Sequence, residues 1–309
     1  MTGGSMHARD GVRSGRLAGV ATGTGHFAVL AIDHVRSFAT TVRPDDPDSF
    51  TPDDIRSAKL ELVEGLAAHA AAVLVDPGFL AGLGAGRRES LRGTGLILGI
   101  EDGDYEDVIT APRLLPGWDV RRASELDVDA VKISVYFDPD GDTAAAERFV
   151  TDVAAQCEAT GTPLFCEPLA LYGRPEDRRR AVLEGVRIFG HLGADVLKLQ
   201  FPEPGARTAS CREWVEACRE VDRLSPVPWT ILSEGGDYGL FRQQLRSACR
   251  AGASGFLAGR AVWREAATGQ AGLSSGTDRL DELRGIAVSE GVPWPDRAGH
   301  RKGWQESRT

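Results

Sequence analysis

DVLKLQFP, residues 195–202, is a short apolar run that contains a single lysine. Runs of about four to eight such residues are typical of parallel strands that are buried on both faces. Eight of them follow one another, separated by amphipathic or charged segments: HFAVLAID (26–33), AAVLVDP (71–77), GLILGIE (95–101), DAVKISVYF (129–137), PLFCEPLAL (163–171), DVLKLQFP (195–202), PWTILSE (228–234) and GFLAGRAVW (255–263). Eight strand–helix alternations predict an α/β fold, the (β/α)₈ TIM barrel. A doubly wound sheet is the alternative, but the GxGxxG turn that often follows its first strand is absent.

The segments between the runs have the composition and termini of helices. Thr51 followed by Pro52 is typical of an N-cap and a first helical turn, and several segments end in Gly. Helices are expected, for example, over residues 51–70, 142–161, 174–193 and 240–252.

One domain accounts for most of the chain. We expect a flexible leader over residues 1–18, the barrel over residues 19–292, and a loosely held tail over residues 293–309. The last helical region is expected within residues 264–292.

Composition excludes several classes of protein. The chain has 309 residues, 42% of them hydrophobic, and a formal net charge of −9. No apolar stretch approaches the roughly 20 residues needed to cross a bilayer, and the N-terminus lacks the apolar core of a signal peptide. No Lys/Arg stripe stands out against the negative charge, so neither nucleic acid nor a membrane is an expected partner.

The cysteines and histidines argue against disulfides and metal ligation. Five cysteines, an odd number without CxxC spacing, fit a reducing cytoplasm better than a disulfide framework or a zinc site. The six histidines form no HxxxH or HxH pair. We therefore predict chemistry without a metal or another cofactor.

Two lysines are predicted to lie inside the barrel. Leu197 and Leu199 would face the helices, which turns Lys198 inward. Lys132 follows the same alternation, with Ser134 and Tyr136 inward on the same strand. A lysine needs an uncharged amine to attack a carbonyl, and desolvation or a nearby positive charge lowers the pKa of a lysine. One lysine is then the nucleophile and the other its assistant; the alternative is a buried ion pair with a carboxylate on each strand.

Three acids stand at the ends of predicted strands. Asp33, Glu101 and Glu167 close the first, third and fifth runs, at the rim where barrel enzymes gather catalytic groups. A carboxylate there can take and return the protons of an aldol cleavage. The alternative is that each acid caps a loop or pairs with a lysine.

Glycine-rich turns follow the last two strands. LSEGGD (232–237) and AGRAVW (258–263) lie where barrels hold phosphate with backbone N–H groups. The guanidinium of Arg260 suits a phosphate or a sulfonate. The alternative is a tight loop with Arg260 in a surface salt bridge.

Taken together, the chain resembles the class I aldolase family that contains tagatose 1,6-bisphosphate aldolase and sulfofructosephosphate aldolase. The similarity covers roughly residues 18–265. It is carried by LAIDHVRS, VLVDP, IEDGDY, VKISVYFDPD, CEP, GADVLKLQFP, PWTILSEGG and AGASGFLAGRAVW.

The resemblance implies a role for each matching residue. The Schiff-base lysine falls on Lys198, the assisting lysine on Lys132 and the acid/base carboxylate on Glu167. Further polar contacts fall on Asp33 and Glu101. The C1-phosphate site falls on the glycine-rich turns, at Ser233, Gly235, Gly236, Gly259 and Arg260.

Two departures from the family pattern fall in substrate-binding loops. The family reads D-Q-R after the first strand, where this chain has Asp33, His34 and Val35, so the arginine that helps to hold the distal anionic group is lost. The alternative is that Arg36, one residue later, compensates through a rearranged loop. After Ser233 the family has a small residue followed by Gly-Val, whereas here Glu234 brings a carboxylate beside the phosphate site. We therefore expect a substrate whose distal end differs from that of a standard bisphosphate. His34 is left as either a substrate contact or a loop hydrogen-bonder.

The sequence thus predicts a class I aldolase that cleaves or forms the C3–C4 bond of a ketose phosphate. The substrate would resemble tagatose or fructose 1,6-bisphosphate or sulfofructose 1-phosphate, giving dihydroxyacetone phosphate and an aldehyde. The alternatives are a sugar-phosphate isomerase or epimerase, which would use the carboxylates without an imine, and a non-catalytic sugar-phosphate-binding barrel. We also expect a homo-oligomer in the cytoplasm.

Overall fold

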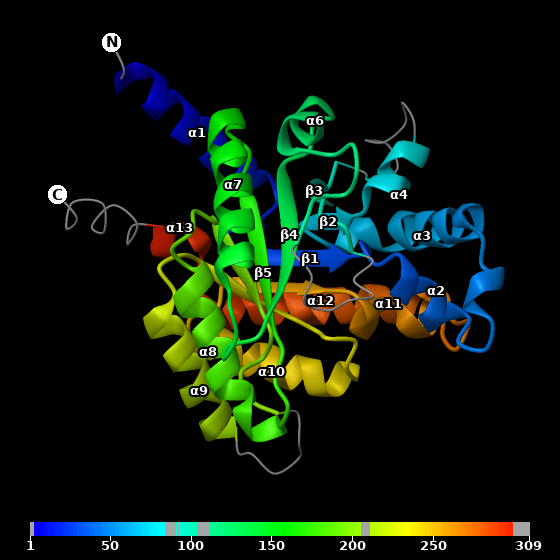
Figure 1. Cartoon of the computed structure of the whole chain (residues 1–309). Coiled ribbons are helices and arrows are strands. Elements are labelled where there is room, and N and C mark those ends of the chain that lie inside the picture. Colours follow the sequence, from blue (N-terminus) through cyan, green and yellow to red (C-terminus); the bar gives the residue numbers. More distant parts are fainter. Residues whose placement is uncertain (1–2, 84–90, 92, 104–111, 205–210, 299–309) are drawn as a thin grey trace.

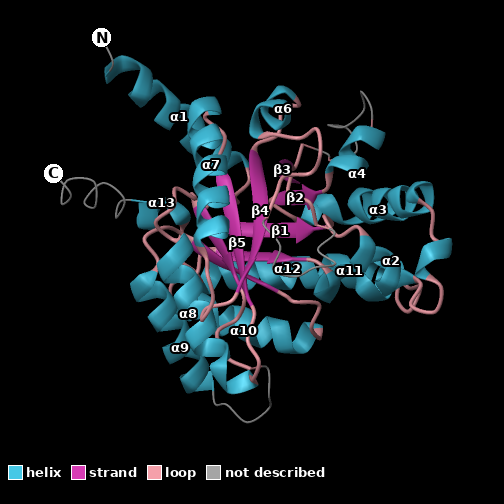
Figure 2. Cartoon of the chain, in the orientation of Figure 1, coloured by secondary structure: helices cyan, strands magenta, loops and turns pink. Residues whose placement is uncertain are grey.

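The predicted (β/α)₈ barrel is confirmed. A computed structural model describes residues 3–83, 91, 93–103, 112–204 and 211–298. Within them, parallel strands close into a barrel in the order β1 to β8, surrounded by helices (Figures 1 and 2). The strands are β1 Phe27–Ala31, β2 Ala72–Val75, β3 Gly95–Gly99, β4 Ala130–Phe137, β5 Leu164–Ala170, β6 Val196–Leu199, β7 Trp229–Leu232 and β8 Gly255–Ala258. The helices are α1 Gly3–Gly19, α2 Arg36–Val42, α3 Pro52–Leu66, α4 Pro77–Gly82, α6 Val120–Glu125, α7 Ala144–Thr160, α8 Arg178–Phe189, α9 Cys211–Leu224, α10 Tyr238–Ala251, α11 Arg260–Ala267, α12 Leu273–Glu290 and α13 Trp294–Ala298.

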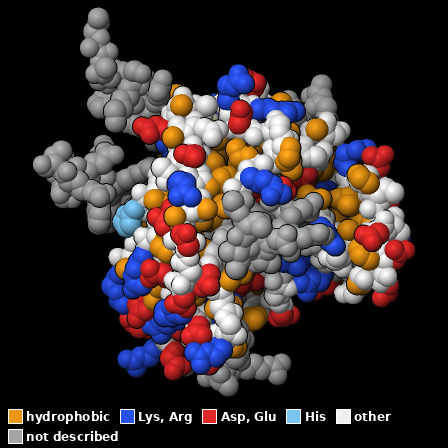
Figure 3. Space-filling model, in the orientation of Figure 1, with side chains coloured by type: hydrophobic (Ala, Val, Ile, Leu, Met, Phe, Trp, Pro, Cys, Tyr) orange, Lys and Arg blue, Asp and Glu red, His pale blue; other side chains and the backbone are white. Residues whose placement is uncertain are grey.

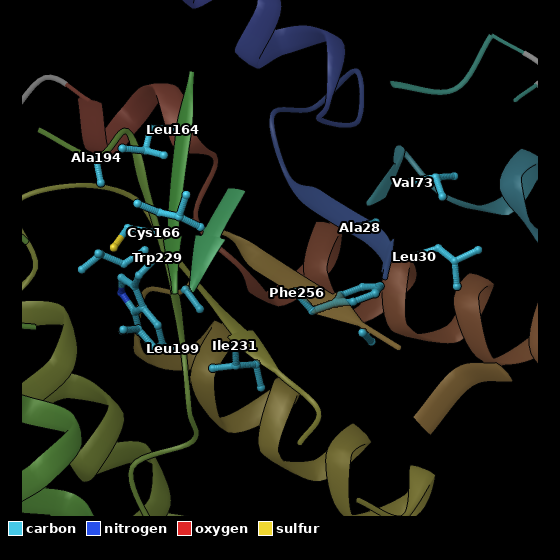
Figure 4. Packing of buried hydrophobic residues seen from close by; sticks show 14 of the residues in the cluster. Ala28, Leu30, Val73, Leu164, Cys166, Ala194, Leu199, Trp229, Ile231 and Phe256 are labelled. Carbon is cyan, nitrogen blue, oxygen red and sulfur yellow. The ribbon is translucent and has the colours of Figure 1, made fainter. Parts of the chain in front are cut away.

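Alternate strand residues divide the core into two layers. Leu197 and Leu199 belong to the large outer cluster between the strands and the helices, part of which is seen in Figure 4, whereas Val196 belongs to the inner cluster. The inner cluster also takes one to three inward residues from most other strands: Phe27, Val29, Ala31, Ala72, Leu74, Ile97, Ala130, Phe165 and Leu257. On β4 and β6 the next inward residues after Ala130 and Val196 are the polar Lys132 and Lys198. The predicted inward and outward faces of β4 and β6 are therefore confirmed.

Local sequence signals explain where several helices begin. Thr51 caps α3 in a capping box, in which its side chain accepts from the Asp54 backbone N–H and Asp54 accepts from the backbone N–H of Thr51. Pro52 occupies the first turn, as predicted. These interactions stabilise a helix that contacts α4.

The eighth strand is shorter than the run 255–263 suggested. It ends at Ala258, and α11 begins at Arg260 immediately after Gly259. The sequence RAVWREAA has an apolar face at helical spacing, with Ala261, Val262 and Trp263 buried. Arg260 is therefore the first residue of a helix, at the mouth of the barrel.

The N-terminal segment differs from the flexible leader that we expected. Residues 3–19 form α1, the helix that extends from the barrel towards the N-terminus in Figure 1. Its C-terminal part is attached to the barrel: Leu17 is buried, and Arg13 Nη2 lies 2.6 Å from Asp195 Oδ2. An apolar contact and an ion pair near the start of β6 thus extend the folded region to residues that precede residue 19.

The C-terminal segment also begins with structure. α13 lies within the predicted tail, where Trp294 packs against the inner cluster and Arg297 pairs with Asp222. Residues 1–2 and 299–309, the remaining parts of the predicted leader and tail, lie outside the described residues.

The surface over α8 and α9 carries charges of both signs (Figure 3). Arg180 pairs with Asp140, and Arg179 with Glu203 and Glu220. Exposed pairs of this kind contribute at most about 1 kcal/mol each, so the packed layers hold the fold together. No helix in the part of the chain that the structure describes has the length and apolar character needed to cross a membrane.

Candidate active site

A cavity of about 860 Å³ opens at the C-terminal ends of the strands. All but one of the residues that the sequence singled out line it: Asp33, His34, Glu101, Lys132, Glu167, Lys198, Ser233, Gly235, Gly259 and Arg260. Gly236 is the exception, because its N–H donates to the Ser233 carbonyl at 2.8 Å and closes the turn. The prediction of a single site at the barrel mouth is in this respect consistent with the structure, and Gly236 is a correction.

Lys132, on β4, lies at the centre of three carboxylates. Its Nζ lies 2.5 Å from Glu101 Oε1, 2.8 Å from Glu167 Oε2 and 3.0 Å from Asp33 Oδ2. Asp33 and Glu101 follow the ends of β1 and β3, whereas Glu167 lies in the middle of β5 and not at its end as we expected, because β5 continues to Ala170; closure of the barrel brings the three acids together. Lys132 is therefore a buried cation compensated by more than one negative charge.

Lys198, on β6, contacts the same carboxylate from the other side. Its Nζ lies 2.9 Å from Glu167 Oε1, while Oε2 of Glu167 faces Lys132 and accepts a hydrogen bond of 2.8 Å from Ser134 Oγ. Glu167 on β5 thus bridges lysines from the two flanking strands. Among the described residues, Glu167 is the acid that pairs with Lys198, so the two lysines are not equivalent.

The charges in this cluster have clear physical causes. Burial would raise the pKa of Glu167, but attraction to Lys132 and Lys198 outweighs it and lowers that pKa. The same balance, with the two lysines and His34, holds the pKa of Asp33 well below its ordinary value.

The pKa values of Glu101, the third acid, and of Lys132 are raised. Burial dominates at Glu101 and raises its pKa despite the nearby Lys132. For Lys132, burial acts to lower the pKa, but attraction to Asp33, Glu101 and Glu167 raises it well above the ordinary value. Lys132 therefore stays charged, as an assisting cation must.

His34 lies between the acidic cluster and Arg260. Burial, only partly opposed by Asp33, lowers the pKa of His34 to about 4, so its imidazole is neutral near pH 7. Nδ1 lies 3.6 Å from Asp33 Oδ1, and the ring packs edge-on against Trp263. The structure therefore presents His34 as a neutral polar group of the cavity wall.

The turn after β7 and the start of α11 form the other end of the cavity. Gly235 has a φ of +69°, and a Cβ there would lie 2.6 Å from Arg260 Cζ, so the guanidinium packs directly on this glycine. Arg260 Nε is buried and has no hydrogen-bond partner among the described residues. Arg260 thus lines the cavity, and the alternative of a surface salt bridge is not what the structure shows.

Glu234 also lines the cavity, but both of its carboxylate oxygens are engaged by protein partners. Its Oε2 pairs with Arg178 of α8, and its Oε1 accepts a 3.0 Å hydrogen bond from Gln200 Nε2. The like charge that the sequence placed beside the phosphate site is therefore compensated by a residue that we did not predict.

Four cavity or supporting residues were not identified as site residues from the sequence. The alternation of side chains along β4 and β6 places Ser134, Tyr136 and Gln200 inward, so this pattern could have identified them as cavity residues. Burial, followed by repulsion from Glu167, raises the pKa of Tyr136. Arg178 had no such signal, because its contact depends on how α8 packs beside the turn after β7.

Chemically, the cavity offers a primary amine beside a carboxylate, with a fixed second cation behind it. An amine in this setting can add to a carbonyl, and the carboxylate can carry the protons that the addition displaces. Arg260, which lines the same cavity, suits an anionic group.

A family model described as DeoC/LacD family aldolase matches residues 40–265 of the chain. Two curated relatives are 27% identical. One is tagatose 1,6-diphosphate aldolase 2 of Streptococcus mutans serotype c, aligned over 91% of this chain and 96% of that protein. The other is tagatose 1,6-diphosphate aldolase 1 of Streptococcus pyogenes serotype M1, aligned over 88% and 94%.

Solved structures share the fold at low sequence identity. An archaeal fructose-1,6-bisphosphate aldolase, with its catalytic lysine covalently bound to the carbinolamine intermediate of the substrate, superposes with a TM-score of 0.64 at 19% identity, covering 90% of this chain and 100% of that one. Fructose-bisphosphate aldolase from Slackia heliotrinireducens gives a TM-score of 0.69 at 13% identity, covering 96% and 92%.

Proposed function

Because the chain belongs to the DeoC/LacD family of aldolases, which are lyases, we propose that it is a class I aldolase that forms its Schiff base on Lys198. One observation carries this assignment. Glu167 lies between two cavity lysines, and Lys132 is surrounded by three carboxylates whereas Lys198 pairs with Glu167. Lys198 is the lysine less committed to ion pairs and so the better nucleophile.

The reaction begins with addition of the Lys198 amine to the keto carbon and loss of water, which gives a protonated imine. As the C3–C4 bond breaks, Glu167 takes the proton of the C4 hydroxyl, which becomes the carbonyl of the aldehyde product. The electron pair of the broken bond moves into the imine to form an enamine. Return of a proton to C3 and hydrolysis then release a three-carbon ketone and restore the amine.

Lys132 and Ser134 determine which oxygen of Glu167 reacts. Both bind Oε2, so Oε1 is the oxygen left facing Lys198 and the bond to be cleaved. Once Lys198 has become an imine it has fewer protons to donate, and Oε1 can accept the substrate proton instead.

The substrate is a ketose that carries an anionic group at C1, a phosphate held by Ser233, Gly235, Gly259 and Arg260. Its products are dihydroxyacetone phosphate and an aldehyde. The exposed Val35 at the mouth of the cavity stands in place of an arginine, and the cavity wall carries an arginine one residue later, at Arg36. This changed position supports a distal group other than the phosphate of a standard bisphosphate. A sulfonate or an uncharged group there is consistent with this cavity, and equal cleavage of ordinary 1,6-bisphosphates would contradict the idea.

A cytoplasmic location and a homo-oligomer belong to the same proposal. The five cysteines, all free thiols in the structure, are consistent with a reducing compartment.

Borohydride trapping tests the Schiff base. The chain has four lysines, Lys59, Lys132, Lys198 and Lys302, so peptide mass spectrometry can assign the modified one without ambiguity. With dihydroxyacetone phosphate and borohydride we expect irreversible modification at Lys198 and loss of activity. Lys198→Met should abolish trapping, whereas an isomerase or a binding protein would not be trapped. Modification at Lys132 alone, or none, would contradict the assignment.

A further inference from the structure

Arg178 is a buried cation beside the cavity that the proposed reaction does not use. Its side chain is only 11% exposed, and each of its nitrogens has a partner: Nε donates to the Phe201 carbonyl at 2.6 Å, Nη1 to Tyr172 Oη, and Nη2 to Glu234. A guanidinium held on three sides cannot swing into the cavity without breaking this network. Its effect on a ligand is therefore exerted through Glu234.

Glu234 lies at a strained position in the turn after β7. Its φ of +48° is in the left-handed region, which a residue with a side chain adopts at a cost. Both carboxylate oxygens are engaged, by Arg178 and by Gln200, and the Gln200 amide is itself oriented by accepting from the Ala170 N–H at 2.8 Å. The turn is thus fixed in a conformation that turns the carboxylate towards α8.

The neighbouring charges show what this pairing achieves. Arg260 and Arg264 both lie against Gly235: the Arg260 guanidinium packs on it, and Arg264 donates to its carbonyl. Neither arginine pairs with a carboxylate among the described residues. Burial, followed by repulsion from Arg264, lowers the pKa of Arg260, and the weaker opposing effects of Tyr136 and Asp33 do not cancel this.

We propose that Arg178 is a specificity-determining positioning residue: by neutralising Glu234, it keeps this end of the cavity cationic and so makes the enzyme select a ketone that carries a phosphate-like anion. This inference rests on the proposed function, because the cavity is taken to be the substrate site. Without Arg178, the charge of Glu234 would offset one arginine of α11 and repel the incoming anion. In a partly buried site, an uncompensated like charge near the ligand weakens binding by roughly tenfold or more.

Isothermal titration with inorganic phosphate tests the charge effect directly. We expect Arg178→Met to weaken phosphate binding at least tenfold, and the double variant Arg178→Met/Glu234→Gln to return to within about threefold of the native protein. Arg179→Met is the matched control, because Arg179 lies on the same helix but pairs with Glu203 and Glu220. Should Arg178→Met not fold, Arg178→Gln, which can still donate to the Phe201 carbonyl, makes the same comparison.

Borohydride trapping gives a second readout that a purely structural role would not change. The ratio of half-saturating concentrations for dihydroxyacetone and dihydroxyacetone phosphate is independent of the fraction of folded protein. We expect this preference for the phosphorylated ketone to fall at least tenfold in Arg178→Met and to be restored in the double variant.

The outcomes separate the two proposals. Unchanged phosphate affinity in Arg178→Met, or a double variant as weak as the single one, would overturn the role of Arg178 even if Lys198 is trapped. Failure of both ketones to be trapped in the native protein would overturn the Schiff-base function, while the phosphate titration would still decide whether Arg178 acts through Glu234.

Discussion

At the scale of single residues, the site depends on how one carboxylate is shared. Lys132 and Lys198 both face inward from the middle of a strand, yet their surroundings differ because Lys132 meets three acids and Lys198 pairs with Glu167. The hydroxyl of Ser134 adds a hydrogen bond to Glu167 Oε2. We therefore expect Ser134 to position the proposed base without contacting the reacting atoms.

Replacing Ser134 by Ala should affect the rate more than binding. Loss of a hydrogen bond to a carboxylate disfavours its charged form, so the pKa of Glu167 should rise. We expect kcat to fall about tenfold with little change in KM, and the acidic limb of the kcat–pH profile to move up by about one pH unit.

Ser254→Ala is the matched control for this prediction. Ser254 is fully buried, its Oγ has no hydrogen-bond partner among the described residues, and it does not line the cavity. Its substitution should leave the pH profile in place. A Ser134→Ala enzyme whose kcat falls without any shift of the acidic limb would contradict a role in tuning Glu167.

At the scale of elements, a buried ion pair links α3 to the end of β2. Lys59 is 1% exposed and pairs with Asp76, whose other oxygen accepts from the Phe79 backbone N–H at the start of α4. Asp76 and the following Pro77 also line the cavity. The pair therefore connects the outer layer of helices to the mouth of the barrel.

Lys59→Met should destabilise the protein by about 3 kcal/mol, because it leaves a buried carboxylate without its partner. Urea unfolding measures this loss. Lys59→Met/Asp76→Asn should recover part of it, since no buried charge is then left unpaired. Arg56→Met, on the same helix in an exposed pair with Asp53, should change stability by less than about 1 kcal/mol. An equally small loss for Lys59→Met would show that the buried pair does not hold the two elements together.

At the scale of the whole molecule, closure of the barrel concentrates charge at its centre. The pKa values of Asp33 and Glu167 are lowered by the lysines, so their contribution to stability is present above the unfolded value of about 4 and is lost as the pH falls through the folded pKa. The pKa of Lys132 is raised, so its contribution is present below about 10.4 and is lost as the pH rises through its folded pKa. Glu101, whose pKa is raised, acts in the opposite sense to the other two acids.

The free energy of unfolding of Lys132→Met should therefore vary with pH in a different way from that of the native protein. Without the cation, burial would raise the pKa of each acid in the cluster. Protonation of these acids would then remove uncompensated negative charge and stabilise the variant relative to the native protein. We expect the gap in unfolding free energy between the two proteins to be largest near pH 7 and to shrink by at least about 1 kcal/mol at pH 4. Urea unfolding at pH 7, 5.5 and 4 measures it, and a gap that does not change with pH would contradict this electrostatic account.

The sequence by itself determined the barrel and which strand residues face its interior. Both follow from local rules, because a buried parallel strand is an apolar run and its side chains alternate with a period of two. Lys132 and Lys198 could therefore be placed inside from their runs alone, whereas Glu167 was expected at the end of its strand and lies within β5. The start of α11 at Arg260 and the helix at residues 3–19 were missed, since strand and helix compete within short segments and tertiary packing selects between them.

Only the tertiary structure decided which charges meet. That three acids surround Lys132, and that Arg178 takes the charge of Glu234, depends on side-chain conformations and on the packing of α8 beside the turn after β7. These contacts join residues far apart in the chain, and the strength of each depends on burial, which sequence spacing does not encode. Pattern was therefore sufficient to place the reactive amine, whereas its electrostatic surroundings are a property of the folded barrel.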